Sequence, residues 1–263
     1  MTNGKFYDII YSGGDGMKKL YNKNQLMFSI VLIVIYVVGA SICDSVSEKT
    51  GLTKALTLPF FIFFSAVILL FLGKEKLFRE YGLCKSQLPA KKLLYYIPLV
   101  LLCLLNVIKG MSITKTVPVI ILEVLSMLFV GFLEEIIFRG FLFKAMAKDN
   151  LKAAVIVSSL TFGIGHIINL LNGAEIVSTL CQIVGAVGFG FMCVMIFIKS
   201  KSLLPCIITH SVFNMLSVFT VETDMMTSII VSVAMLVITT GYAIILSKGA
   251  VHNNENDKHS ETD

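Results

Sequence analysis

The chain has 263 residues, of which 56% are hydrophobic and 15% are charged, and its formal net charge is +5. This hydrophobic content excludes an ordinary soluble domain and indicates an all-α protein that crosses a membrane several times. The charged residues gather between apolar runs, as in loops between spans, so the positive charge does not predict binding to nucleic acid. The six cysteines form no C-x-x-C pair, and we expect no cysteine-based zinc site.

The apolar runs predict a bundle of about eight transmembrane helices, because roughly 20 residues are needed to cross the hydrocarbon of a bilayer. The third and seventh runs are short for this purpose. The predicted spans are 26–43, 55–72, 93–108, 117–143, 153–171, 176–198, 203–219 and 225–246.

Polar segments divide the chain into five predicted regions. They are an N-terminal cytoplasmic segment (1–25), helices with a basic amphipathic loop (26–116), a central core (117–220), a last helix (221–248) and a polar, disordered tail (249–263). The polar start and the length of the first apolar run predict a retained helix rather than a cleaved signal peptide.

Basic residues are concentrated in alternate loops, and the positive-inside rule places such loops in the cytoplasm. We therefore expect both termini of this integral membrane protein to be cytoplasmic. The residues that set this orientation are Lys18, Lys19, Lys23, Lys74, Lys76, Arg79, Lys85, Lys91, Lys92, Lys144, Lys148, Lys152, Lys199 and Lys201.

The fourth run contains three charged residues, Glu134, Glu135 and Arg139. Each charge inside a membrane costs roughly 2.5–3.5 kcal/mol on insertion scales, so such residues are usually functional. Arg139 follows Glu135 by four residues and shares its helix face, which predicts an ion pair between them. Glu134 is then left unpaired and free to face a cavity. The alternative is a structural ion cluster that locks helices together.

Two of the four histidines, His166 and His210, lie inside predicted spans. Asn214 follows His210 by four residues on the same helix face. With about 1.5 Å of rise per residue, both histidines, Asn214 and Glu134 lie roughly 10–20 Å from the cytoplasmic ends of their helices. We therefore expect them to meet in one cavity open to the cytoplasm. The alternatives are a core histidine at His166 and hydrogen bonds between helices at His210 and Asn214.

Three motifs, E-E-x-x-x-R, F-x-x-x-H and H-x-x-x-N, follow one another along the chain. They consist of Glu134, Glu135 and Arg139, then Phe162 and His166, then His210 and Asn214. This order and spacing resemble the CPBP family of intramembrane proteases, which includes CAAX-prenyl-protease-2-like and bacteriocin-processing, Abi-like proteins. The resemblance covers about residues 117–220 and leaves the first two helices and the tail outside.

The resemblance implies that Glu134, with His166, activates a water molecule, that His210 and Asn214 stabilise the oxyanion, and that Glu135 and Arg139 orient the helix. Two mechanisms stay open. In the first, Glu134, His166 and His210 hold Zn²⁺ and leave a fourth position for water. In the second, no metal is needed and hydrogen-bond donors face the developing charge. Asn214 suits the second role better than zinc ligation.

The expected activity is hydrolysis of a peptide bond in a membrane-associated peptide or small protein, near its terminus, with membrane lipids as the other partner. We favour a bacterial plasma membrane, where relatives are linked to peptide maturation, bacteriocin self-immunity or surface-protein display. One rival function is a non-catalytic relative that binds a peptide or membrane protein. The other is a transporter with a proton-relay carboxylate, which would show inverted repeats and broken helices.

Overall fold

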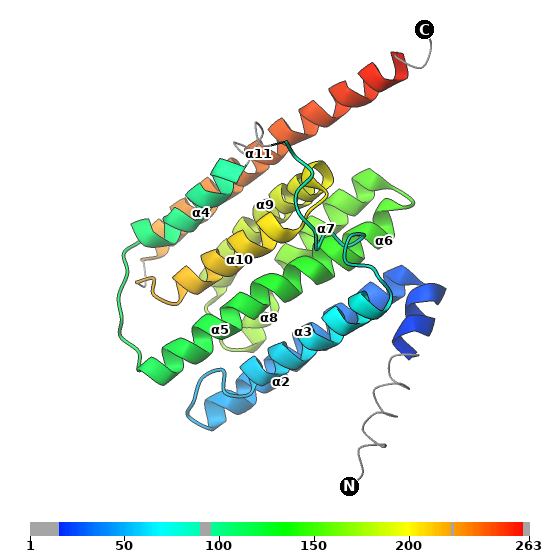
Figure 1. Ribbon diagram of the computed structural model, residues 1–263. Coiled ribbons are helices and arrows are strands. Elements are labelled where there is room, and N and C mark those ends of the chain that lie inside the picture. Colours follow the sequence, from blue (N-terminus) through cyan, green and yellow to red (C-terminus); the bar gives the residue numbers. More distant parts are fainter. Residues whose placement is uncertain (1–15, 90–95, 222–223, 260–263) are drawn as a thin grey trace.

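The computed structural model of the protein describes residues 16–89, 96–221 and 224–259 and is an all-α bundle (Figure 1). In this part of the chain, β pairing is confined to an isolated bridge between Met111 and Thr220. A short helix at 16–23 comes first. The elements that follow are α2 (Gln25–Lys49), α3 (Thr57–Lys74), α4 (Ile97–Ile108), α5 (Val117–Glu134), η2 (Glu135–Leu142), α6 (Phe143–Ala147), α7 (Leu151–Gly165), α8 (Ile168–Leu171), α9 (Ile176–Ser200), α10 (Leu204–Ser217) and α11 (Met225–His259).

Side-chain caps and prolines explain where many helices begin. Asn24 caps α2 by accepting a hydrogen bond from the Met27 amide, and Asn150 caps α7 through the Ala153 amide. A proline lies in the first turn of α4, α5 and α10, where its missing N–H costs no helical hydrogen bond. These local signals place the helix starts close to the predicted ones.

The polytopic architecture is confirmed, and the structure refines the number of spans. Six helices among the described residues are long and apolar enough to cross a membrane. The two runs predicted to be short form α4 and α10, of 12 and 14 residues. At about 1.5 Å per residue, neither covers the roughly 30 Å hydrocarbon alone.

The predicted fourth span is one continuous helix of 31 residues, Val117–Ala147, formed by α5, η2 and α6. Its segment η2 is a π-helix of eight residues, all of them buried. Neighbouring helices satisfy part of its altered hydrogen bonding, since the Ser158 hydroxyl donates to the Phe138 carbonyl at 2.8 Å. π-Helical turns occur frequently at functional sites, and this one begins directly after Glu134.

Glycines let the central helices approach closely. α10 packs on α5 and α4, while α9 packs on α7 and α11. A Cβ added to Gly131 of α5 would lie 2.3 Å from Ser211 Oγ and 2.5 Å from its backbone nitrogen in α10. Gly163 of α7 is equally close to Val187 of α9. The first contact brings together two of the helices that carry the motifs, α5 and α10, and the second joins α7 to α9.

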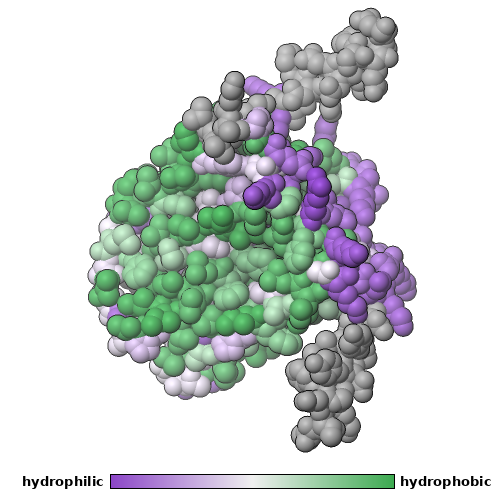
Figure 2. Space-filling model, viewed as in Figure 1, coloured by the Kyte–Doolittle hydropathy of each residue, from purple (hydrophilic) through white to green (hydrophobic). Residues whose placement is uncertain are grey.

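The two ends of the bundle differ in character. The loops after α3, α6 and α9 lie at one end with most of the described basic residues, which we call the basic end; hydrophilic side chains gather there in Figure 2. Five buried aromatic rings fill the bundle near this end: Tyr21, Phe28, Phe71, Tyr81 and Phe141. Tyr81, from the basic amphipathic loop, is a core residue because it packs on Phe141 and donates a hydrogen bond to the Tyr21 hydroxyl.

The predicted terminal regions correspond only in part to the described residues. Helix α11 continues to His259, whereas the sequence predicted a disordered tail from residue 249. Once a helix has formed, each further residue adds a hydrogen bond at little cost, which explains the continuation. Most of the predicted N-terminal segment, together with Lys91 and Lys92 of the basic loop, lies outside the described residues.

Candidate active site

Glu134 ends α5 next to two polar partners. The Tyr36 hydroxyl, on α2, donates a hydrogen bond to Glu134 Oε1 at 2.8 Å. His210 Nε2, on α10, lies 3.5 Å from Glu134 Oε2. The prediction that Glu134 has no partner is therefore wrong, because the packing of α2 against this helix cannot be inferred from the spacing of residues along either helix. The acid still faces a cavity, as described below.

Glu135 is completely buried directly behind His210. Its Oε1 lies 2.8 Å from His210 Nδ1, and its Oε2 lies 3.4 Å from Arg139 Nε, the ion pair that the spacing predicted. An ionised carboxylate only accepts hydrogen bonds, so His210 donates an Nδ1 proton to Glu135, and its Nε2 faces Glu134. Second carboxylates of this kind fix the tautomer and the orientation of a working histidine.

The Phe162 ring lies at the centre of the three motifs. The Arg139 guanidinium carbon lies 3.8 Å above its centroid, a cation–π contact for a side chain that is fully buried. His166 and His210 meet the same ring edge-on, with centroids at 5.3 and 5.7 Å. Phe162 therefore sets the positions of the arginine and of both imidazoles.

His166 lies at the end of a helix rather than inside one. α7 ends at Gly165, a tight turn follows, and α8 begins at Ile168, so the predicted span 153–171 is interrupted. His166 Nδ1 lies 3.1 Å from the Phe162 carbonyl oxygen. A carbonyl can only accept, so the proton is on Nδ1 and Nε2 is left as an acceptor.

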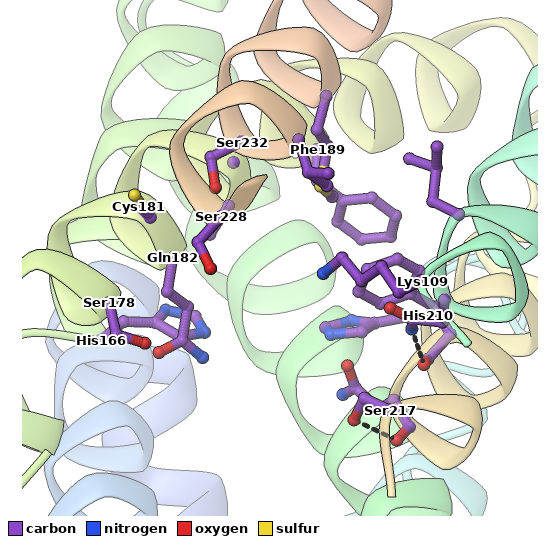
Figure 3. A pocket seen from close by; sticks show the side chains of 18 of the residues that line it. Lys109, His166, Ser178, Cys181, Gln182, Phe189, His210, Ser217, Ser228 and Ser232 are labelled. Atoms are coloured by element: carbon purple, nitrogen blue, oxygen red, sulfur yellow. Dashed lines mark hydrogen bonds between the residues drawn. The ribbon is translucent and has the colours of Figure 1, made fainter. Parts of the chain in front are cut away.

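Two neighbouring cavities meet at these residues. The acid cavity, of about 330 Å³, is lined by Glu134, Tyr36 and Asp44 among others. The lysine cavity, of about 280 Å³, is lined by His210 and Lys109 among others. In Figure 3, the Lys109 ammonium points into the lysine cavity, with His166 and Gln182 on one side and His210 on the other. The residues that line both cavities are Phe162, His166, Gln182, Asn214 and Ser217.

Asn214 lies one helical turn beyond His210, as predicted, and lines both cavities. Its backbone carbonyl accepts a hydrogen bond from Ser217 at 2.6 Å. Its side-chain amide has no hydrogen bond to another described residue. The amide is therefore available to a ligand at the junction of the two cavities.

The cavities extend toward the end of the bundle opposite the basic end. The outer part of the acid cavity is lined by Asp44, Lys54 and Asn172. The outer part of the lysine cavity is lined by Lys109 and Ser228. The sequence predicted a cavity on the same side as Lys144 and Lys148. That prediction is wrong, because counting residues along a helix gives the depth of a side chain but not the side from which a cavity is open.

The donor set predicted for zinc is not gathered in one place. Metal ligands have to converge within a few ångströms, since Zn–N and Zn–O distances are about 2.0–2.2 Å. Among the described residues, Glu134, His166 and His210 do not form a group whose ligand atoms all lie within 4.8 Å of one another, whereas Glu135, Cys193 and Cys206 do. That second group is a poor cation site, because Glu135 is already paired with Arg139. In this geometry the residues do not fit a zinc ion.

Sequence reasoning missed three residues of the site. Tyr36 lies in the first predicted span, and a buried tyrosine hydroxyl needs a partner, which is the signal that could have identified it. Lys109 was assigned to a loop. Gln182 lies in the predicted span 176–198, where it lines both cavities and accepts a hydrogen bond from Asn169 at 2.8 Å.

Residues 114–216 match the family model Rce1-like, described as type II CAAX prenyl endopeptidase Rce1-like. This match supports the resemblance to the CPBP family over these residues. The comparison with curated proteins found no match.

The segment that matches the Rce1-like model contains all six predicted site residues, from Glu134 to Asn214. Tyr36 and Lys109 lie outside it, on α2 and at the end of α4. The family is one of membrane proteases, so the match supports protease activity for this integral membrane protein. The matched helices supply the acid, the imidazoles and the amide, while the helices before them complete the walls of both cavities.

Proposed function

We propose that the protein is an intramembrane endopeptidase that hydrolyses a peptide bond of a membrane-associated peptide or small protein. One observation carries the proposal. Glu134 and His210, which come from separate helices, face each other at 3.5 Å beside two cavities that meet at His166 and Asn214. An acid, two imidazoles and an amide around one space are suited to attack by an activated water molecule.

In the proposed reaction, Glu134 takes a proton from water while the water oxygen attacks the carbonyl carbon of the substrate. The Asn214 amide donates a hydrogen bond to the oxyanion that forms, a type of contact worth about 2.7–4 kcal/mol in other hydrolases. Glu134 then returns the proton to the nitrogen of the leaving group as the C–N bond breaks. His166 Nε2 accepts from the same water and orients it.

Metal dependence remains a prediction, and the geometry favours the mechanism without metal. His210 turns one nitrogen to each of two carboxylates, and the three predicted ligands do not converge. We expect a strong chelator to leave activity unchanged. Activity that is lost with chelator and restored by Zn²⁺ would show that the ligands gather around a metal in the working enzyme.

The substrate class follows from the position of the cavities and from the family description. Both cavities lie within the span region, so the substrate is presented at the membrane. The matched family is described as CAAX prenyl endopeptidases, and we propose a cut near the carboxyl terminus of a membrane-anchored chain. Apart from the histidines, Lys109 is the charged residue on the described lining of the lysine cavity. This cavity would hold the segment of the substrate on the carboxyl-terminal side of the cut.

The test uses the full chain reconstituted in lipid vesicles with a panel of lipidated and unlipidated peptides. Mass spectrometry in ¹⁸O-labelled water detects the new carboxyl terminus and shows that its oxygen comes from solvent. Glu134→Gln should abolish cleavage, while the matched variant Glu123→Gln should retain it. Glu123 lies on the same helix and is paired with Lys115 at 2.5 Å, away from the site.

The outcomes separate the candidate functions. Wild-type levels of proteolysis by Glu134→Gln would remove Glu134 from the mechanism. Peptide binding without cleavage by the wild type would favour a non-catalytic relative. Movement of a solute across the vesicle membrane, without cleavage, would favour a transporter.

A further inference from the structure

A tyrosine from outside the matched segment holds the proposed base. Tyr36 lies on α2, and its hydroxyl donates to Glu134 Oε1 at 2.8 Å. The ring is 7% exposed and stacks on Phe61 of α3, with centroids 5.8 Å apart and planes at 29°. Packing therefore fixes the ring, and the fixed ring fixes the direction of the hydroxyl.

The two oxygens of Glu134 consequently have different surroundings. Oε1 receives the Tyr36 hydroxyl, whereas Oε2 faces His210 Nε2 at 3.5 Å. A carboxylate oxygen that accepts a short hydrogen bond from a neutral donor is less available to take a proton. Oε2 is then the more basic oxygen of Glu134, and it is the oxygen that lies beside the His210 imidazole.

We propose that Tyr36 is a positioning residue for Glu134, which selects Oε2 as the oxygen that accepts the proton of water. The proposal rests on the proposed function, because it assigns a role within that reaction. It adds α2 to the reaction centre, although α2 contains none of the three motifs.

The other charged groups near Glu134 already have partners. His210 approaches from α10 and also contacts Glu135, which is paired with Arg139 within η2. Asp44 lines the same cavity but is held by Lys54 and Thr57, and α3 contributes the apolar Phe61. Among the described residues, Tyr36 is the one whose side chain donates a hydrogen bond to Glu134.

The test is Tyr36→Phe, which removes the hydroxyl and keeps the ring on Phe61. Hydrogen bonds to charged groups contribute enough that their loss reduces a rate by about tenfold to hundredfold. We expect kcat to fall by this factor with KM nearly unchanged.

The matched control is Tyr81→Phe. Its hydroxyl is also buried and hydrogen-bonded, to Tyr21 at 2.9 Å, but it lies near the basic end. This variant should retain wild-type kcat. If Tyr36→Phe behaves in the same way, the role of Tyr36 is packing alone and the proposal is overturned.

A second measurement separates this proposal from the proposed function. Infrared difference spectra between the wild type and Glu134→Gln isolate the carboxylate bands of Glu134. In the Tyr36→Phe background the splitting between these bands should change, whether or not any peptide is cleaved, because Oε1 no longer accepts the tyrosine hydrogen bond. An unchanged splitting would overturn the role of Tyr36, whereas an inactive wild type with a changed splitting would overturn only the proteolysis.

Discussion

At the scale of single residues, a few side chains of the site each make several contacts with the others. His210 faces Glu135 through Nδ1 and Glu134 through Nε2. Phe162 contacts Arg139 and both imidazoles. A change at one of these side chains therefore alters several distances at once, and single substitutions will not be additive.

Arg139 offers a direct test of the buried ion pair. Arg139→Met leaves Glu135 charged and buried without its cation, a change that typically costs about 3–5 kcal/mol. We expect a large fall in the thermal midpoint, and a smaller fall in the double variant Glu135→Gln/Arg139→Met. Unfolding can be followed by the reaction of the buried thiols of Cys193 and Cys206 with a fluorogenic maleimide. Equal falls for the single and double variants would mean that the pair contributes little.

Local spacing was sufficient to predict some contacts of the site but not others. The Glu135–Arg139 pair follows from a separation of four residues on one helix, which any helical geometry preserves. The Tyr36–Glu134 hydrogen bond joins residues 98 positions apart, and it depends on how α2 packs against η2. No periodicity in either helix encodes that packing, so the partner of the acid could not be predicted.

At the scale of helices, close approach places the motifs in register. Gly131 lies one turn before Glu135, directly against Ser211, which follows His210. The Ser211 hydroxyl also donates to the Leu128 carbonyl at 2.9 Å, a further link between α5 and α10. The distance between the acids and His210 therefore depends on the absence of a side chain at residue 131.

Gly131→Ala should separate these helices. The added Cβ would lie 2.5 Å from a backbone nitrogen that cannot rotate away, and overpacking of this kind costs about 1–3 kcal/mol. We expect a lower thermal midpoint together with loss of most proteolysis. Gly241→Ala is the control, since its Cβ would meet no described atom within 4 Å. Full activity of Gly131→Ala would show that the helices tolerate a shift.

The α-helix is interrupted at His166, between α7 and α8, and hydropathy alone does not predict this break. The run 153–171 is mostly apolar, and its length predicts one span, in agreement with the candidate span Leu151–Leu171. The structure ends α7 at Gly165, where the amides of His166 and Ile167 bond three residues back at 3.1 and 2.9 Å. Tightened last turns are common at helix ends, but a hydropathy pattern contains no information about them.

At the scale of the whole molecule, the basic residues and the cavities occupy opposite ends. If the basic end is cytoplasmic, as the positive-inside rule predicts, both cavities open on the other side of the membrane. The sequence indicated the number of long apolar runs and the charge bias correctly. It could not show which end is hollow, because that depends on loops and helix ends packing in three dimensions.

Labelling with a membrane-impermeant maleimide tests this orientation. In a background without the six native cysteines, Lys49→Cys and Asp149→Cys place one exposed thiol at each end. We expect intact cells to label Lys49→Cys, and Asp149→Cys to react only after permeabilisation. The reverse pattern would place the cavity openings in the cytoplasm.

The five aromatic rings near the basic end have a consequence for the fate of a cut chain. Most of these ring contacts are edge to face and the Tyr81–Phe141 contact is tilted, and none of the five rings lines the acid cavity or the lysine cavity. We therefore expect the cleaved product to leave through the same opening by which the substrate entered. Cleavage would then move no part of the substrate from one side of the membrane to the other.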